Sequence, residues 1–220
     1  MREFFRNKIS GLRSKDVPPP KEKPPVTMIE LQTPAGLETF GSRIAQTNGT
    51  AAIVVHPFFP DWNPSRFADR IYKASYENYI DLLARSTRRH RENGLPLIIL
   101  EEDIVLNKLP TNLSRIGVDS GDVFVVPTHD STPEPIQGNL TALARNLQNI
   151  GLARAVVSGS YLWVNGPKID HFSFTPGMPG IYERNSFQGC VGYTINALLR
   201  AGVKTTHGVG TFPPEKDWSR

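Results

Sequence analysis

Apolar runs and helical stripes alternate along the chain from residue 27 onward. Continuous runs rich in β-branched residues are typical of strands covered on both faces. Apolar residues spaced three and four apart are typical of helices that pack on a sheet. The runs predict strands at residues 27–31, 51–55, 95–100, 122–126, 152–157 and 203–209. The stripes predict helices at residues 33–46, 63–94, 109–117, 138–151 and 189–202.

The order of these elements predicts the fold class. Strand and helix alternate at the spacing of βαβ units, which favours a parallel sheet with helices on both faces. Thr33 is a typical N-cap residue before Pro34, and Gly94 and Gly202 follow two of the helices as stop signals. We therefore expect an α/β fold, a three-layer Rossmann-like sandwich with a mostly parallel central sheet.

Two segments do not fit the alternation. Residues 1–26 are basic and proline-rich, and we expect a disordered tail and linker; the alternative is a short helix that contacts a partner or a membrane surface. Residues 27–220 are expected to form a single α/β domain with an aromatic loop insertion at 161–189. That insertion is either a lid over a binding site or a β-hairpin that packs on the body.

Charge and cysteine content restrict the function classes. The net charge is +4, and residues 1–26 hold seven basic and three acidic residues, so the tail accounts for the whole excess. A neutral body argues against nucleic-acid binding by the folded part. The apolar runs are too short for a transmembrane segment. With a single cysteine and no apolar leader at the N-terminus, a cytoplasmic location is expected.

Polar side chains follow five of the predicted strands. The carboxyl ends of parallel strands share one edge of the sheet, where such folds bind small-molecule ligands. We expect His129 and Asp130 to be central and catalytic. Glu101 and Asp103 would share one strand face if the strand continues to Asp103, with Glu102 directed away. The other expected ligand-binding residues are His56, Ser158, Ser160, Tyr161 and Trp163, and His207 is expected to be a neighbour of the site. A simpler interpretation is that polarity returns after each strand because loops are solvated.

One chemistry that these residues could support is metal-assisted hydrolysis. Imidazole and carboxylate groups from separate strand ends can bind a divalent metal that activates water. The expected ligands are His56, His129, Asp130 and His207. No His-Glu-x-x-His motif accompanies them.

A second chemistry uses Cys190 as a nucleophile. Cys190 lies in the first turn of a predicted helix, where the helix dipole lowers a thiol pKa, and a neighbouring carboxylate or His129 would act as base. The stretch AVVSG at 155–159, followed by GCVGYTINALLRAG at 189–202 and a closing strand, resembles the end of the isochorismatase-like cysteine hydrolases. The resemblance implies a nucleophilic role for Cys190 and extends to no other residue. Otherwise Cys190 is a small buried residue at a helix–sheet contact.

The favoured function is therefore a small-molecule hydrolase or related enzyme with its site at the carboxyl edge of the sheet, with metal assistance as one option. An isochorismatase-like cysteine hydrolase using Cys190 is one alternative. A non-catalytic ligand-binding or scaffold module, tethered by its basic N-terminal tail, is the other. Strongly perturbed titratable groups within reach of one another would favour an enzyme.

Overall fold

The central element of the fold is a six-stranded parallel sheet. The computed structural model describes residues 24–58, 70–130, 132–160, 163–164 and 187–208. The sheet has the strand order β1-β4-β3-β2-β5-β8, and every neighbouring pair is parallel. The strands are β1 (Val26–Glu30), β2 (Thr50–Val55), β3 (Leu97–Glu102), β4 (Gly121–Thr128), β5 (Arg154–Gly159) and β8 (Lys204–His207). The predicted α/β class with a parallel sheet is confirmed.

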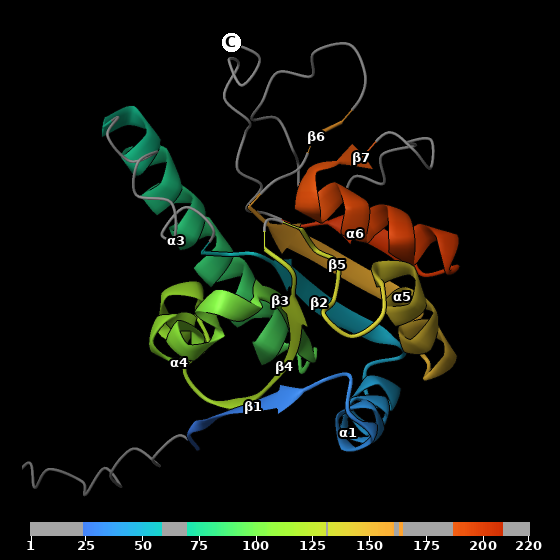
Figure 1. Cartoon of the computed structure of the whole chain (residues 1–220). Coiled ribbons are helices and arrows are strands. Elements are labelled where there is room, and N and C mark those ends of the chain that lie inside the picture. The colour runs from blue at the N-terminus through green and yellow to red at the C-terminus, as the bar shows by residue number, and fades with distance from the viewer. Residues whose placement is uncertain (1–23, 59–69, 131, 161–162, 165–186, 209–220) are drawn as a thin grey trace, which may run out of the picture.

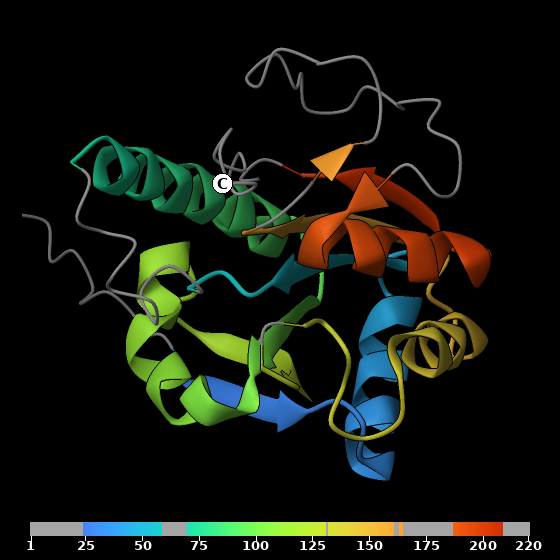
Figure 2. The same cartoon turned by 45° about the horizontal axis from the view of Figure 1, so that its top comes forward.

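Helices cover both faces of this sheet (Figures 1 and 2). One face carries α1 (Pro34–Ala45), α5 (Leu140–Asn149) and α6 (Gly189–Arg200). The other carries the long α3 (Arg70–Glu92), the short α4 (Leu109–Asn112) and the 3-10 helices η2 (Asp103–Lys108) and η3 (Leu113–Ile116). The sequence predicted one short helix at 109–117, and the structure divides that segment between α4 and η3.

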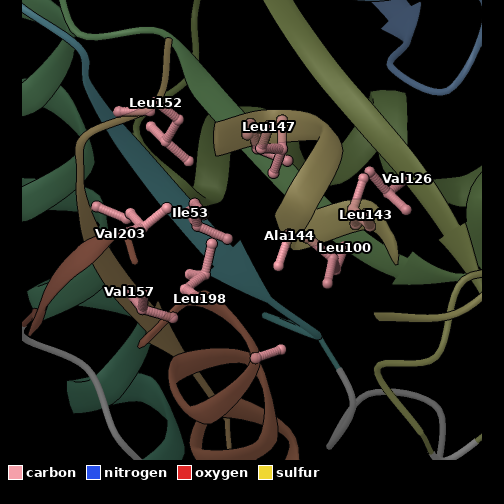
Figure 3. Close-up of a cluster of buried hydrophobic side chains, with 14 of the residues drawn as sticks. Ile53, Leu100, Val126, Leu143, Ala144, Leu147, Leu152, Val157, Leu198 and Val203 are labelled. Carbon is pink, nitrogen blue, oxygen red and sulfur yellow. The ribbon is translucent and has the colours of Figure 1, made fainter. Parts of the chain in front are cut away.

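The alternation of side chains along each strand builds a separate apolar core on each face. In β2, Ile53 and Val55 join the core under α1, α5 and α6, whereas Ala52 and Val54 join the core under α3. Figure 3 shows the first core, where side chains of α5 and α6 meet those of the central strands. Burial on both faces explains why the strands are continuous apolar runs in the sequence.

The predicted helix starts are confirmed where the structure describes them. The Thr33 side chain caps α1 by accepting a hydrogen bond from the Gly36 amide at 3.0 Å. Asn139 caps α5 in the same way, through the Ala142 amide at 2.8 Å. Each cap satisfies an amide that has no partner inside its helix.

Parts of the two irregular segments are described. Of the predicted tail, only residues 24–26 are described; Val26 already belongs to β1, and the Pro25 carbonyl accepts a bond from the Gly121 amide at 3.2 Å. In the 161–189 insertion, β6 (Trp163–Val164) pairs antiparallel with β7 (Phe187–Gln188), and the lid expected between them lies outside the described residues. Within the described parts of the chain, no helix combines the length and apolarity needed to cross a membrane.

Candidate functional site

The strand order creates a switch point between β2 and β5. From β2 the chain proceeds through β3 to β4 on one side, whereas β5 leads to β8 on the other. Loops that leave the carboxyl ends of two such strands diverge, and doubly wound sheets bind ligands at this place. His56 follows β2 directly, and Ser160 follows β5.

Buried polar residues gather at this edge. Among the described residues, nine polar or charged residues are buried, and six of them lie at the carboxyl ends of the four central strands. These six are His56, Glu101, Glu102, Thr128, Ser158 and Ser160. Solvated loops would leave such side chains exposed, so the interpretation of this edge as ordinary loop polarity does not account for them.

The backbone of His56 is held in an uncommon conformation. Its φ angle is +46°, in the left-handed region that few non-glycine residues adopt. The His56 amide donates to the Leu100 carbonyl at 2.8 Å, and the Ser160 hydroxyl donates to the His56 carbonyl. These contacts to β3 and to the end of β5 hold the turn that directs the imidazole across the strand ends, and backbone strain of this kind is frequent at functional sites.

The imidazole of His56 is fully buried and has one hydrogen bond within the described residues. Nε2 lies 2.9 Å from Oγ1 of Thr128, at the end of β4, whereas Nδ1 has no partner there. Burial lowers the pKa of His56 to about 4, although the negative charge of Asp130 acts in the opposite direction. His56 is therefore neutral at pH 7, and its buried Nδ1 has no hydrogen-bond partner among the described residues.

Two carboxylates at the end of β3 are buried. Glu101 has no exposed area, and Glu102 is 2% exposed. The strand ends at Glu102, and Asp103 begins η2 with its side chain exposed, so the condition under which Glu101 and Asp103 would share one strand face is not met. Glu102 is instead aligned with Thr128 in the β3–β4 register. Aligned residues share a face, so Glu102 and Thr128 both project on the side of α6.

Cys190 completes this group from α6. Its pKa is raised to about 12, first by burial and then by the negative charges of Glu102 and Glu101. The prediction that the helix N-terminus lowers this pKa is wrong in its net result, because burial and the two carboxylates outweigh the backbone hydrogen bonding. At neutral pH Cys190 is a thiol, not a thiolate.

The remaining predicted site residues occupy several environments. His129 and Asp130 are exposed, although the charge of Asp130 acts on His56. Ser158 is buried, and the Ser160 hydroxyl also lies 3.5 Å from the hydroxyl of Tyr79 in α3. Burial lowers the pKa of His207, which ends β8. Tyr161 lies outside the described residues, and Trp163 lies in β6.

The predicted metal ligands are not gathered into one group. In the described ranges of the chain, no three or more His, Cys, Asp and Glu side chains are placed so that they could hold a metal ion. His56 is enclosed, with one nitrogen engaged by Thr128, whereas His129 and Asp130 are exposed. The residues brought together are His56, Thr128, Glu102 and Cys190, of which Glu102 and Thr128 were not predicted.

No protein-family model matches this chain, and comparisons with curated proteins and with solved structures found no significant match. The resemblance of residues 155–159 and 189–202 to the isochorismatase-like hydrolases gains no support from these comparisons. The functional interpretation therefore depends on the geometry of the strand ends.

Proposed function

We propose that the protein is a small-molecule hydrolase whose site lies at the carboxyl edge of the parallel sheet, around His56, Glu102 and Cys190. One observation carries the proposal: a fully buried, neutral imidazole with an unpartnered Nδ1 in the described structure lies at the switch point, beside strands that end in buried carboxylates. Perturbed titratable groups that converge at such an edge are typical of enzymes. Because Cys190 is the chain's single cysteine and no internal disulfide can form, we place the activity in the cytoplasm.

The favoured mechanism uses Glu102 as the general base. Its carboxylate accepts a proton from water as the water attacks the electrophilic atom of the substrate, while His56 forms a hydrogen bond to the substrate through Nδ1. The bond from that atom to the leaving group then breaks, and the protonated Glu102 gives its proton to the departing alcohol or amine. Burial strengthens both interactions, since fewer water molecules compete for them. Asp130 adds negative charge near the imidazole from the rim of the site.

A second mechanism is favoured by the electrostatic contact between Cys190 and Glu102. The charge of Glu102 acts on the thiol, so this carboxylate is positioned to accept the thiol proton as sulfur attacks an acyl carbon. The bond to the leaving alcohol or amine breaks, Glu102 returns the proton to that group, and water then cleaves the thioester and restores the thiol. The result would be a cysteine hydrolase with a carboxylate base. Here Cys190 is a nucleophile only at the moment of proton transfer, because the resting group is a thiol.

A panel of chromogenic esters, amides and phosphate esters tests both mechanisms. We expect Glu102→Gln to reduce kcat by about 100-fold or more, in the range usual for loss of a general base. Glu77→Gln removes an exposed carboxylate on α3, so it is the matched control and should retain activity. Full activity of Glu102→Gln would refute the proposal.

Cys190→Ala separates the two mechanisms. Activity that survives this substitution supports direct attack by water, whereas its complete loss in a folded variant supports the cysteine nucleophile. Thermal unfolding of each variant establishes that the fold is intact. Ligand binding without turnover of any substrate would instead support the non-catalytic binding module.

A further inference from the structure

The hydrogen bond between His56 and Thr128 restricts which nitrogen of the imidazole carries the proton. Thr128 has no exposed area, and its hydroxyl lies 2.9 Å from Nε2 of His56. A hydroxyl can donate to a bare Nε2 or accept from a protonated one. The neutral ring has a single N–H, so the two arrangements put that proton on opposite nitrogens.

If Nε2 carried the proton, Thr128 would accept it, and the threonine's own hydroxyl proton would have no acceptor in the described structure. A buried donor without a partner is costly. Nδ1 would then be a bare lone pair in a region where the charge of Asp130 acts on the ring. Negative charge nearby disfavours a lone pair and favours an N–H group in the same place.

If Thr128 donates instead, its proton is satisfied by Nε2 and the ring proton stands on Nδ1. The group that has no partner in the described structure is then an N–H donor, on a ring where the negative charge of Asp130 acts and favours it. The backbone of His56 is held in place, because its amide and carbonyl are both engaged, and the ring is held at Thr128 by its own hydrogen bond.

We propose that Thr128 is a positioning residue: its hydroxyl donates to Nε2 of His56, keeps the ring proton on Nδ1, and so presents Nδ1–H as a hydrogen-bond donor to an oxygen atom of the substrate. The inference rests on the proposed function and names the substrate class for that site. The charges of Glu101 and Glu102 act on Cys190, and that of Asp130 acts on His56. A negative site disfavours carboxylate and phosphate substrates, so the acceptor is the carbonyl oxygen of an uncharged ester or amide.

Nitrogen NMR of the full chain labelled with 15N-histidine tests the tautomer without any substrate. The signal of His56 is identified by its loss in His56→Asn, and its coupling pattern shows which nitrogen carries the proton at pH 7. We expect the proton on Nδ1. A proton on Nε2 would overturn the proposal.

Substitutions at Thr128 test whether its hydroxyl sets the tautomer. Thr128→Val removes the hydroxyl with little change of volume and should convert the single His56 tautomer into a mixture, whereas Thr128→Ser should restore Nδ1–H. Thr87→Val, at a buried threonine of α3, is the matched control and should leave the spectrum unchanged. The positioning role would be overturned if the tautomer of His56 is unchanged in Thr128→Val, or if Thr128→Ser does not show the Nδ1–H tautomer. If the valine variant does not fold, the spectra of the serine variant and of the native protein still decide.

Activity provides the second measurement. On the best ester or amide of the panel, Thr128→Val should lower kcat about 10-fold with a smaller change in KM, because the loss of one hydrogen bond misplaces a donor rather than removing it. Thr128→Ser should recover most of that loss. A protein with the Nδ1–H tautomer that turns over no substrate would refute the proposed hydrolase function alone, whereas an active protein with the Nε2–H tautomer would refute the role of Thr128 alone.

Discussion

Acidification should weaken the fold through the buried imidazole of His56. The folded-state pKa is about 4, whereas an unfolded chain has the ordinary value of 6.5. Between these values the unfolded chain binds a proton that the folded protein does not, so stability falls as the pH falls through 6.5 and the loss levels off below about 4. From pH 7 to pH 5 the expected loss from this residue is about 2 kcal/mol.

Urea unfolding of the native protein and of His56→Asn at pH 7, 6 and 5 measures this contribution. Asparagine tolerates the positive φ angle at this position, and it does not titrate in this range. With an m-value of roughly 2 kcal/mol per M, the acid-induced decrease of the urea midpoint should be about 1 M smaller in His56→Asn than in the native protein. Thr87→Val controls for simple destabilisation, since it should lower every midpoint but leave the pH dependence unchanged. The same pH dependence in His56→Asn and in the native protein would refute the assignment of a buried neutral imidazole.

Two further predictions concern a thiol and a glycine. Because its pKa is raised to about 12, Cys190 should react with iodoacetamide at pH 8 roughly 1,000-fold more slowly in the native protein than in the unfolded chain. Glu102→Gln should accelerate the reaction of the native protein. Alkylation of the native protein as fast as that of the unfolded chain would contradict this. Gly159 has a φ angle of +151°, and a Cβ atom there would collide with the Val55 carbonyl, so Gly159→Ala should cost about 3 kcal/mol or more in urea unfolding. At Gly202 φ is also positive, but no atom of the described residues beyond its chain neighbours lies within 4 Å of the added Cβ. Gly202→Ala should therefore cost only about 1 to 2 kcal/mol, and equal losses would show that the collision with Val55 is unimportant.

Much of the fold could be predicted from local patterns. The central strands are buried on both faces, and this burial produces the continuous apolar runs that identified them. Thr33 stands where capping requires an acceptor, so the start of α1 could also be predicted, whereas the cap at Asn139 was not predicted. The strand order could not be read, because nothing local indicates that the first strand pairs with β4.

The site was only partly predictable. The rule that ligands bind at the carboxyl edge directed attention to the correct strands, but the expected centre at His129 and Asp130 is exposed. Glu102 was not predicted as a site residue, because the alternation of side chains along a strand directs it to the opposite face from Glu101. Alternation gives the side on which a residue projects but not what covers it, and here Glu102 is buried on the side of α6, a helix that follows it by almost 90 residues.

The pairing of β1 with β4 determines the order in which the strands can pair while the chain is being synthesised. Ninety residues lie between Glu30 and Gly121, so at typical synthesis rates β1 waits about 5 to 20 s for its partner strand to be made. The strands β2 and β3 are also synthesised during that interval, and they can pair with each other before β1 has a partner. The N-terminal strand is thus made first and joins the sheet late, at its edge. A nascent chain that stalls before residue 121 carries β1 as an unsatisfied template for pairing with other chains.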